Sequence, residues 1–185
     1  MNKKFIYLIG LILGIFAFIL NAFVVANMAG GVPIYFGSAI VLFCLLALPF
    51  RISVLVLCAS MAPLLIYESP LFIGWLHSLQ FFVIVTMLHF RVRFLSAILL
   101  FWLVIGLPIT SMIVYINLSL SFQVSVFIAL PFILSGYICG MSALLVYWLL
   151  PINSQLKKFN ILPKFSRLVF EFNLVSVMLP LFIVV

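Results

Sequence analysis

The chain has 185 residues, 69% of them hydrophobic, and its only acidic residues are Glu68 and Glu171. A water-soluble fold needs far more polar surface than this composition supplies, so a bilayer is the expected solvent. Nine basic residues give a net charge of +7. They do not form a stripe interleaved with aromatic residues, which argues against nucleic acid as a partner.

Six long apolar runs follow one another along the chain. Continuous apolar runs near 20 residues predict transmembrane helices, and these runs lack the alternation of a membrane β-barrel. The predicted helices cover residues 5–26, 34–50, 52–67, 71–90, 94–116 and 124–150. We therefore predict an all-α membrane protein in which residues 1–150 form a six-helix transmembrane bundle.

The first run begins like a signal peptide, because Lys3 and Lys4 precede it. It is longer than the roughly 7 to 15 apolar residues of a signal sequence, so we predict an uncleaved helix. Gly10 and Gly14 form a GxxxG motif in this run. The motif permits close contact with another helix, although chance spacing of the two glycines is an open alternative.

The connections between the runs are short. Gly30, Gly31 and Pro33 interrupt the apolar signal after the first run, since glycine permits unusual backbone angles and proline lacks an N–H donor. Arg51 alone separates the second and third runs, which predicts a tight helical hairpin. These two helices are short for a hydrocarbon layer about 30 Å thick, so we expect longer neighbours to shield them.

The basic residues predict how the chain is oriented. All of them fall before the first run, on alternate loops, or after the sixth run: Lys3, Lys4, Arg51, Arg91, Arg93, Lys157, Lys158, Lys164 and Arg167. The opposite loops carry no basic residue. By the positive-inside rule, the amino terminus and the basic loops are cytoplasmic.

The last part of the sequence differs from the bundle. Residues 151–167 form a basic, polar segment that we interpret as a cytoplasmic linker. Residues 168–185 predict a seventh, carboxyl-terminal transmembrane helix, and its apolar run reaches the last residue. Such an end indicates a truncated protein, with a naturally short membrane protein as the alternative.

The sequence contains few groups that could perform chemistry. It has no Asp, and His77 and His89 would lie about 18 Å apart along one helix, too far to share a metal ion. Cys44, Cys58 and Cys139 occur singly, without CxxC spacing. No hydrolase triad or phosphate-binding motif is present. We therefore predict no catalytic residues, no metal and no cofactor.

Three polar residues lie inside the fourth apolar run. His77, Ser78 and Gln80 occupy a region where an unsatisfied polar group is costly. We hypothesise that they line a ligand-binding pocket. The alternative is hydrogen bonding between helices that only holds the bundle together.

Two segments resemble a known family. GGVPIYFGS at 30–38 and FWLVIGLPI at 101–109 are similar to the multi-spanning amino-terminal sensor region of bacterial histidine kinases and diguanylate cyclases. LPKFSRLVFEFNLVSVMLP at 162–180 resembles the segment that leads from such a bundle toward an extracytoplasmic sensory domain. The resemblance covers roughly residues 30–180.

The resemblance implies roles for several residues in these motifs. It matches positions that shape the sensor bundle: Gly30, Gly31, Pro33, Tyr35, Gly37, Trp102, Gly106 and Pro108. We add Tyr35 and Trp102 to the candidate ligand-binding residues. The implied location is the bacterial inner membrane, and the implied process is signal transduction.

The predicted function is therefore a membrane-embedded sensory input module whose kinase or cyclase output is absent from this sequence. A small-molecule transporter or substrate-capture component is the main alternative, because helices interrupted by proline and glycine can enclose a site at the membrane midplane. An interaction or scaffold subunit also stays open. The expected partners are the lipid bilayer and an unknown small-molecule ligand, with a homodimer left open.

Overall fold

A computed structural model describes residues 3–23, 25–27, 33–67 and 72–149. Within these residues the fold is helical apart from one small two-stranded ribbon. The elements in chain order are α1 (Lys3–Phe23), β1 (Val25–Asn27), β2 (Pro33–Tyr35), α2 (Phe36–Ala47), α3 (Phe50–Tyr67), α4 (Phe72–His89), α5 (Phe94–Phe101), the π-helical turn η2 (Trp102–Gly106), α6 (Leu107–Leu118) and α7 (Phe122–Leu149). Gly30, Gly31, the predicted linker and the predicted seventh helix lie outside the described residues.

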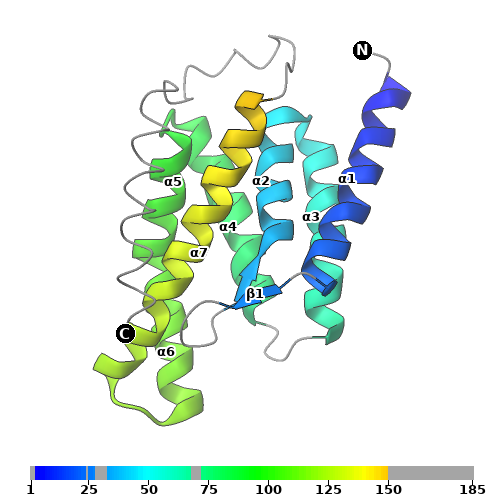
Figure 1. Ribbon diagram of the computed structural model, residues 1–185. Coiled ribbons are helices and arrows are strands. Elements are labelled where there is room, and N and C mark those ends of the chain that lie inside the picture. Colours follow the sequence, from blue (N-terminus) through cyan, green and yellow to red (C-terminus); the bar gives the residue numbers. More distant parts are fainter. Residues whose placement is uncertain (1–2, 24, 28–32, 68–71, 150–185) are drawn as a thin grey trace.

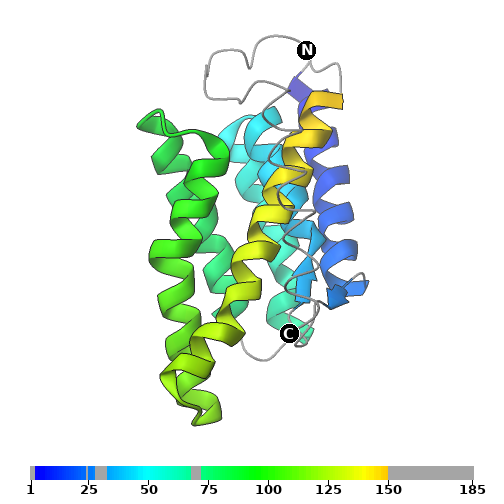
Figure 2. The ribbon, with the colours of Figure 1, turned by 60° about the vertical axis from the view of Figure 1, so that its left-hand side comes forward.

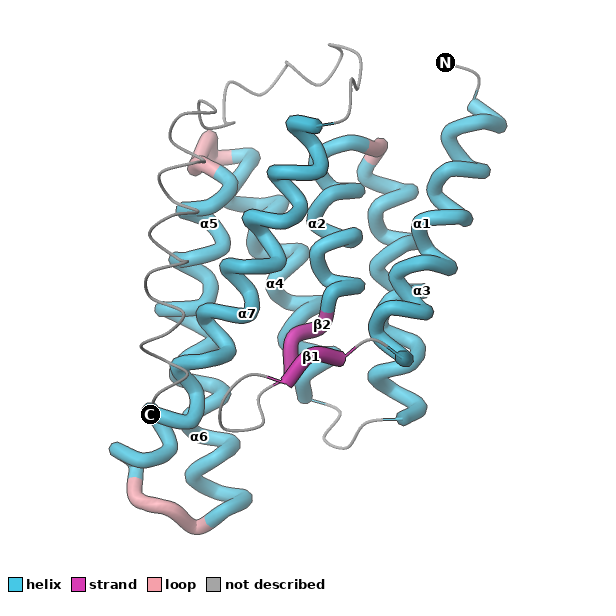
Figure 3. Tube along the Cα trace, in the orientation of Figure 1, coloured by secondary structure: helices cyan, strands magenta, loops and turns pink. Residues whose placement is uncertain are grey.

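The helices form one bundle in which successive segments run in opposite directions (Figure 1). The start of α1, the α2–α3 turn and the α4–α5 turn lie at one end, and the α6–α7 turn lies at the other (Figure 3). α7 crosses obliquely over α2 and has its lower end beside α6 (Figure 2). Each helical segment in the described residues lies largely within one predicted apolar run, and this helical architecture confirms the all-α prediction.

Three helices in the described residues are long and apolar enough to cross a membrane. They cover Lys4–Phe23, Phe94–Leu118 and Phe122–Leu149. The apolar helices over Phe36–Ala47, Phe50–Leu64 and Trp75–His89 are shorter. Length and composition thus identify three candidate membrane spans.

The ribbon changes two predicted helix ends. β1 and β2 pair antiparallel, with Val25 opposite Tyr35 and Asn27 opposite Pro33. The first helix therefore ends at Phe23 instead of residue 26, and the second begins at Phe36 instead of residue 34. Pairing between the strands gives their backbone groups partners without a helix, which is why the apolar residues there are extended.

The hairpin between α2 and α3 is tight, but its turn is not at Arg51. The turn is formed by Leu48 and Pro49, and Arg51 belongs to the first turn of α3. Leu48 is extended, with φ −123° and ψ 161°, because a residue that precedes proline is disfavoured in the helical region. The Ser53 hydroxyl donates to the Cys44 carbonyl over 2.8 Å and ties the two helices together at the turn.

The GxxxG motif of α1 has its partner in the same chain. A Cβ at Gly10 would overlap Cγ2 of Ile52, and a Cβ at Gly14 would lie 3.4 Å from Cβ of Ala59. Both neighbours belong to α3. The glycines thus bring α1 and α3 close together. The large apolar side chains elsewhere on α1, such as Leu11 and Phe16, are exposed.

The rod formed by α5, η2 and α6 contains a local change of helix type. The N–H of Leu107 donates to the carbonyl of Trp102, a spacing of five residues instead of four. Pro108 follows at once and has no N–H to continue a regular α-helical ladder. A π-helical turn accommodates this break without ending the helix.

Candidate ligand site

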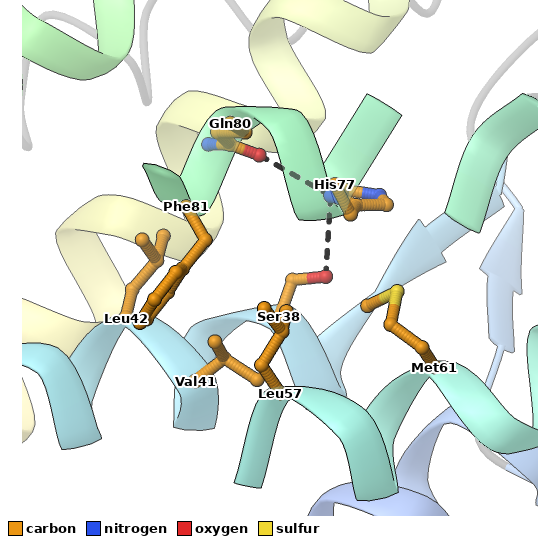
Figure 4. Close-up of a pocket in the computed structure, with 8 residues that line it drawn as sticks. All are labelled: Ser38, Val41, Leu42, Leu57, Met61, His77, Gln80 and Phe81. Atoms are coloured by element: carbon orange, nitrogen blue, oxygen red, sulfur yellow. Dashed lines mark hydrogen bonds between the residues drawn. The ribbon is translucent and has the colours of Figure 1, made fainter. Parts of the chain in front are cut away.

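His77 is the centre of a buried polar cluster between α2 and α4. Its Nδ1 lies 3.2 Å from Oε1 of Gln80 and 3.4 Å from Oγ of Ser38 (Figure 4). The three side chains are 8%, 2% and 5% exposed. His77 and Gln80 are three residues apart on α4 and so share a face, whereas Ser38 comes from the first turn of α2.

Two aromatic rings flank His77. The centroid of Tyr35 is 5.8 Å from that of His77 at an interplanar angle of 79°, and the centroid of Trp102 is 6.1 Å away at 74°. These are edge-to-face contacts, which aromatic rings favour. β2, α4 and the start of η2 thus each contribute one ring to a continuous row.

Trp102 occupies a slot that two glycines leave open. A Cβ at Gly136, on α7, would overlap the indole nitrogen, and a Cβ at Gly106 would overlap the six-membered ring. The side chain is only 2% exposed. The position of the indole therefore depends on glycine both in its own helix and in α7.

A small cavity adjoins the polar cluster. Its volume is about 10 Å³, and its walls come from α2, α3 and α4 (Figure 4). The lining residues are Ser38, Val41, Leu42, Leu57, Met61, His77, Gln80 and Phe81. The cavity therefore has one polar wall, and its other walls are apolar.

Four buried polar side-chain atoms have no hydrogen-bond partner among the described residues. They are Nε2 of Gln80, Nε1 of Trp102, Oγ1 of Thr110 and Oγ of Ser111. All four belong to α4 or to the rod of α5, η2 and α6. A buried polar group without a partner costs about 1 to 3 kcal/mol, and such groups are rare in native proteins. This concentration marks one side of the bundle as a candidate binding region.

The structure brings together four of the five predicted ligand-binding residues. Tyr35, His77, Gln80 and Trp102 form the row and the cluster described above. Ser78 is half-buried on α4 and does not line the cavity. Among the predicted structural positions, Gly37 and Gly106 both lie where a Cβ would overlap a neighbouring side chain. Pro108 is exposed, and Pro33 belongs to β2.

Sequence reasoning missed Ser38 and Gly136. Ser38 lies in the first turn of an apolar helix and is the last residue of the GGVPIYFGS segment. Gly136 and Gly140 form a second GxxxG motif, and this pattern would have indicated a close helix contact on α7.

The fold and the site together define a helical bundle of membrane-spanning character with an uncharged polar pocket. No three His, Cys, Asp or Glu side chains gather into a metal site within the described ranges. In comparisons with protein-family models, curated proteins and solved structures, no significant match was found. The resemblance to bacterial sensor regions thus stays a prediction from the sequence.

Proposed function

We propose that this chain is the membrane-embedded sensory input module of a bacterial signal-transduction receptor, with an output enzyme outside these 185 residues. The position of Trp102 carries the proposal. Its ring is in contact with His77 of the polar cluster, and its carbonyl accepts the hydrogen bond that forms the π-helical turn. In this proposal, an event at the polar cluster reaches the backbone of the rod formed by α5, η2 and α6 through this side chain.

The proposed topology has six membrane crossings and a seventh at 168–185, with the amino terminus in the cytoplasm of a bacterial inner membrane. Lys4, Arg51, Arg91 and Arg93 support it, because all four are exposed at the same end of the bundle (Figures 1 and 3). Basic residues concentrate on the cytoplasmic side of membrane proteins. The shortest of the six proposed crossings is α2, which has 12 residues. It packs against α1, α3 and α7.

Signalling requires two states that a ligand distinguishes. We propose that the two states differ in the π-helical turn, because single π-helical turns inside α-helices are frequent at functional sites. A ligand that engages Gln80 or the indole N–H of Trp102 would stabilise one arrangement. In this proposal the chain performs no catalysis itself.

The test measures the output of the complete receptor in membranes, as kinase or cyclase activity, across a panel of candidate stimuli. His77→Ala and Gln80→Ala should abolish the stimulus-dependent change in output. Ser78→Ala is the matched control on the same helix and should respond like the wild type. Unchanged responses in both cluster variants would contradict the proposal. The reading frame after Val185 should encode the output enzyme, and this is the simplest first check.

Transport of a small polar molecule is the second candidate. The buried hydroxyls of Thr110 and Ser111, which have no hydrogen-bond partner among the described residues, belong to the same rod as Trp102. Interrupted helices that line a polar path are typical of secondary transporters. Substrate uptake into sealed vesicles that is lost in Gln80→Ala would favour transport over sensing.

A further inference from the structure

The polar cluster cannot satisfy its own hydrogen-bonding groups. Nδ1 of His77 carries either one proton or one lone pair, yet it faces both Gln80 and Ser38. If Nδ1 is protonated, it donates to Oε1 of Gln80. The hydroxyl proton of Ser38 then has no acceptor on His77, and Nε2 of Gln80 has no acceptor among the described residues.

The opposite assignment leaves the same shortage. If Nδ1 carries the lone pair, it accepts from the hydroxyl of Ser38, and the amide of Gln80 must turn so that its NH₂ group faces the ring. Such amide orientations are assigned from the hydrogen-bond network. Two donors, the hydroxyl of Ser38 and the NH₂ group of Gln80, then compete for one lone pair. In both arrangements a group of Ser38 or Gln80 needs a further partner.

We infer that the cavity beside Ser38 and Gln80 is a hydration site that holds one water molecule. Both residues line the cavity, and its volume of about 10 Å³ is close to the roughly 10 to 15 Å³ that one water molecule requires. Water both donates and accepts, so it completes the cluster in either arrangement of the amide. This inference concerns binding at the cluster and is independent of whether the chain signals.

The charges around the cavity exclude an ion as the occupant. Among the described residues that line it there is no Lys, Arg, Asp or Glu. An unpaired ion in such an interior would carry a large desolvation cost. A single uncharged molecule is the occupant that these walls accept.

A crystal structure of the full chain grown from a lipid phase tests the inference directly, at a resolution that shows ordered water. We expect a density peak within about 3.2 Å of Oγ of Ser38 or of the Gln80 amide. A well-ordered cluster without such a peak would overturn the inference. Either result leaves the proposed signalling role to be decided by the output assay.

Filling the cavity gives a second, independent test. Val41→Ile adds one carbon to the cavity wall, and we expect the thermal midpoint in nanodiscs to fall by about 3 °C, because the displaced water leaves polar groups unpaired. The same substitution at Val83, a half-buried residue of α4 that does not line the cavity, is the control and should change the midpoint little. A raised or unchanged midpoint in Val41→Ile would indicate a dry cavity and overturn the inference.

The double variant separates loss of water from simple crowding. In a Gln80→Met background the amide that needs the water is gone, so Val41→Ile should lower the midpoint by less than half as much as in the wild type. An equal decrease in both backgrounds would mean that the added carbon only overpacks the core, and the hydration site would be rejected.

Discussion

Two buried amides in this bundle use their hydrogen-bonding capacity in opposite ways. Asn21 of α1 accepts from the N–H of Gly37 over 2.8 Å and donates to the carbonyl of Ser60 over 2.8 Å. The Oε1 atom of Gln80, on α4, is hydrogen-bonded to His77, and its Nε2 has no hydrogen-bond partner among the described residues. Both side chains are at least 97% buried, so burial alone does not distinguish them.

The difference lies in what each amide binds. Asn21 joins backbone groups of α2 and α3 to α1, and hydrogen bonds of this kind persist in an apolar interior because no water competes for them. It is a structural cross-link. Gln80 instead has an Nε2 group without a protein partner among the described residues, and it lines a cavity. The candidate ligand site is therefore identified by buried hydrogen-bonding groups without a partner among the described residues, and not by polarity alone.

The largest expected effect tests the cross-link. Asn21→Leu leaves the N–H of Gly37 and the carbonyl of Ser60 without their side-chain partner, so we expect a loss of about 3 kcal/mol in the free energy of unfolding. Asn117→Leu, at an exposed position of α6, is the matched control and should change stability by less than about 0.5 kcal/mol. Equal stability of the two variants in nanodiscs would show that Asn21 is not a structural cross-link.

The next effect concerns the Trp102 slot on the opposite side of the bundle. In Gly136→Ala the added Cβ overlaps the indole nitrogen, so the ring must move and we expect a loss of about 2 kcal/mol. The Trp102 fluorescence should also shift, measured with Trp75 and Trp148 replaced by Phe. Trp102→Phe removes the overlapping atom. In that background Gly136→Ala should cost less, and an unchanged cost would contradict the slot.

The positions of the helices were largely predictable, because a helix that crosses a membrane requires an apolar run of about 20 residues, and such a run is visible in the sequence. Helix ends were less predictable. The ribbon of β1 and β2 depends on pairing between residues 25–27 and 33–35, which no local pattern indicates. The α2–α3 turn lies at Leu48 and Pro49 and not at Arg51 as predicted. The residue before proline disfavours the helical conformation, and this backbone preference, rather than the charge of Arg51, determines where the helix ends.

The site was predictable only where polarity stands out against its surroundings. His77 and Gln80 are conspicuous in an apolar run, and both belong to the cluster. A serine such as Ser38 gives a weaker signal, because its hydroxyl can bond to the backbone of its own helix. The role of Gly136 depends on Trp102, a residue of another helix, and pairing between helices is not visible in the sequence.

The smallest expected effect concerns the two glycines of α1 that face α3. A Cβ at Gly14 would make ordinary contact with Ala59, whereas a Cβ at Gly10 would overlap Cγ2 of Ile52, a methyl group on the β-carbon that moves only if χ1 of this helical residue turns. Alanine also favours the helix over glycine by up to about 1 kcal/mol. We therefore expect Gly14→Ala to be neutral or slightly stabilising, and Gly10→Ala to destabilise by about 1 kcal/mol because the overlap outweighs the gain in helix propensity.

The same unfolding measurement in nanodiscs then ranks the forces that hold α1 against α3. If Asn21 is the cross-link between the helices, its replacement lowers the free energy of unfolding several times more than either glycine substitution. Alanine at Gly10 or Gly14 leaves every hydrogen bond in place. A loss in Gly14→Ala as large as that in Asn21→Leu would reverse this order. The interface would then be determined by close backbone approach, and the contrast between the amides of Asn21 and Gln80 would no longer separate structure from binding.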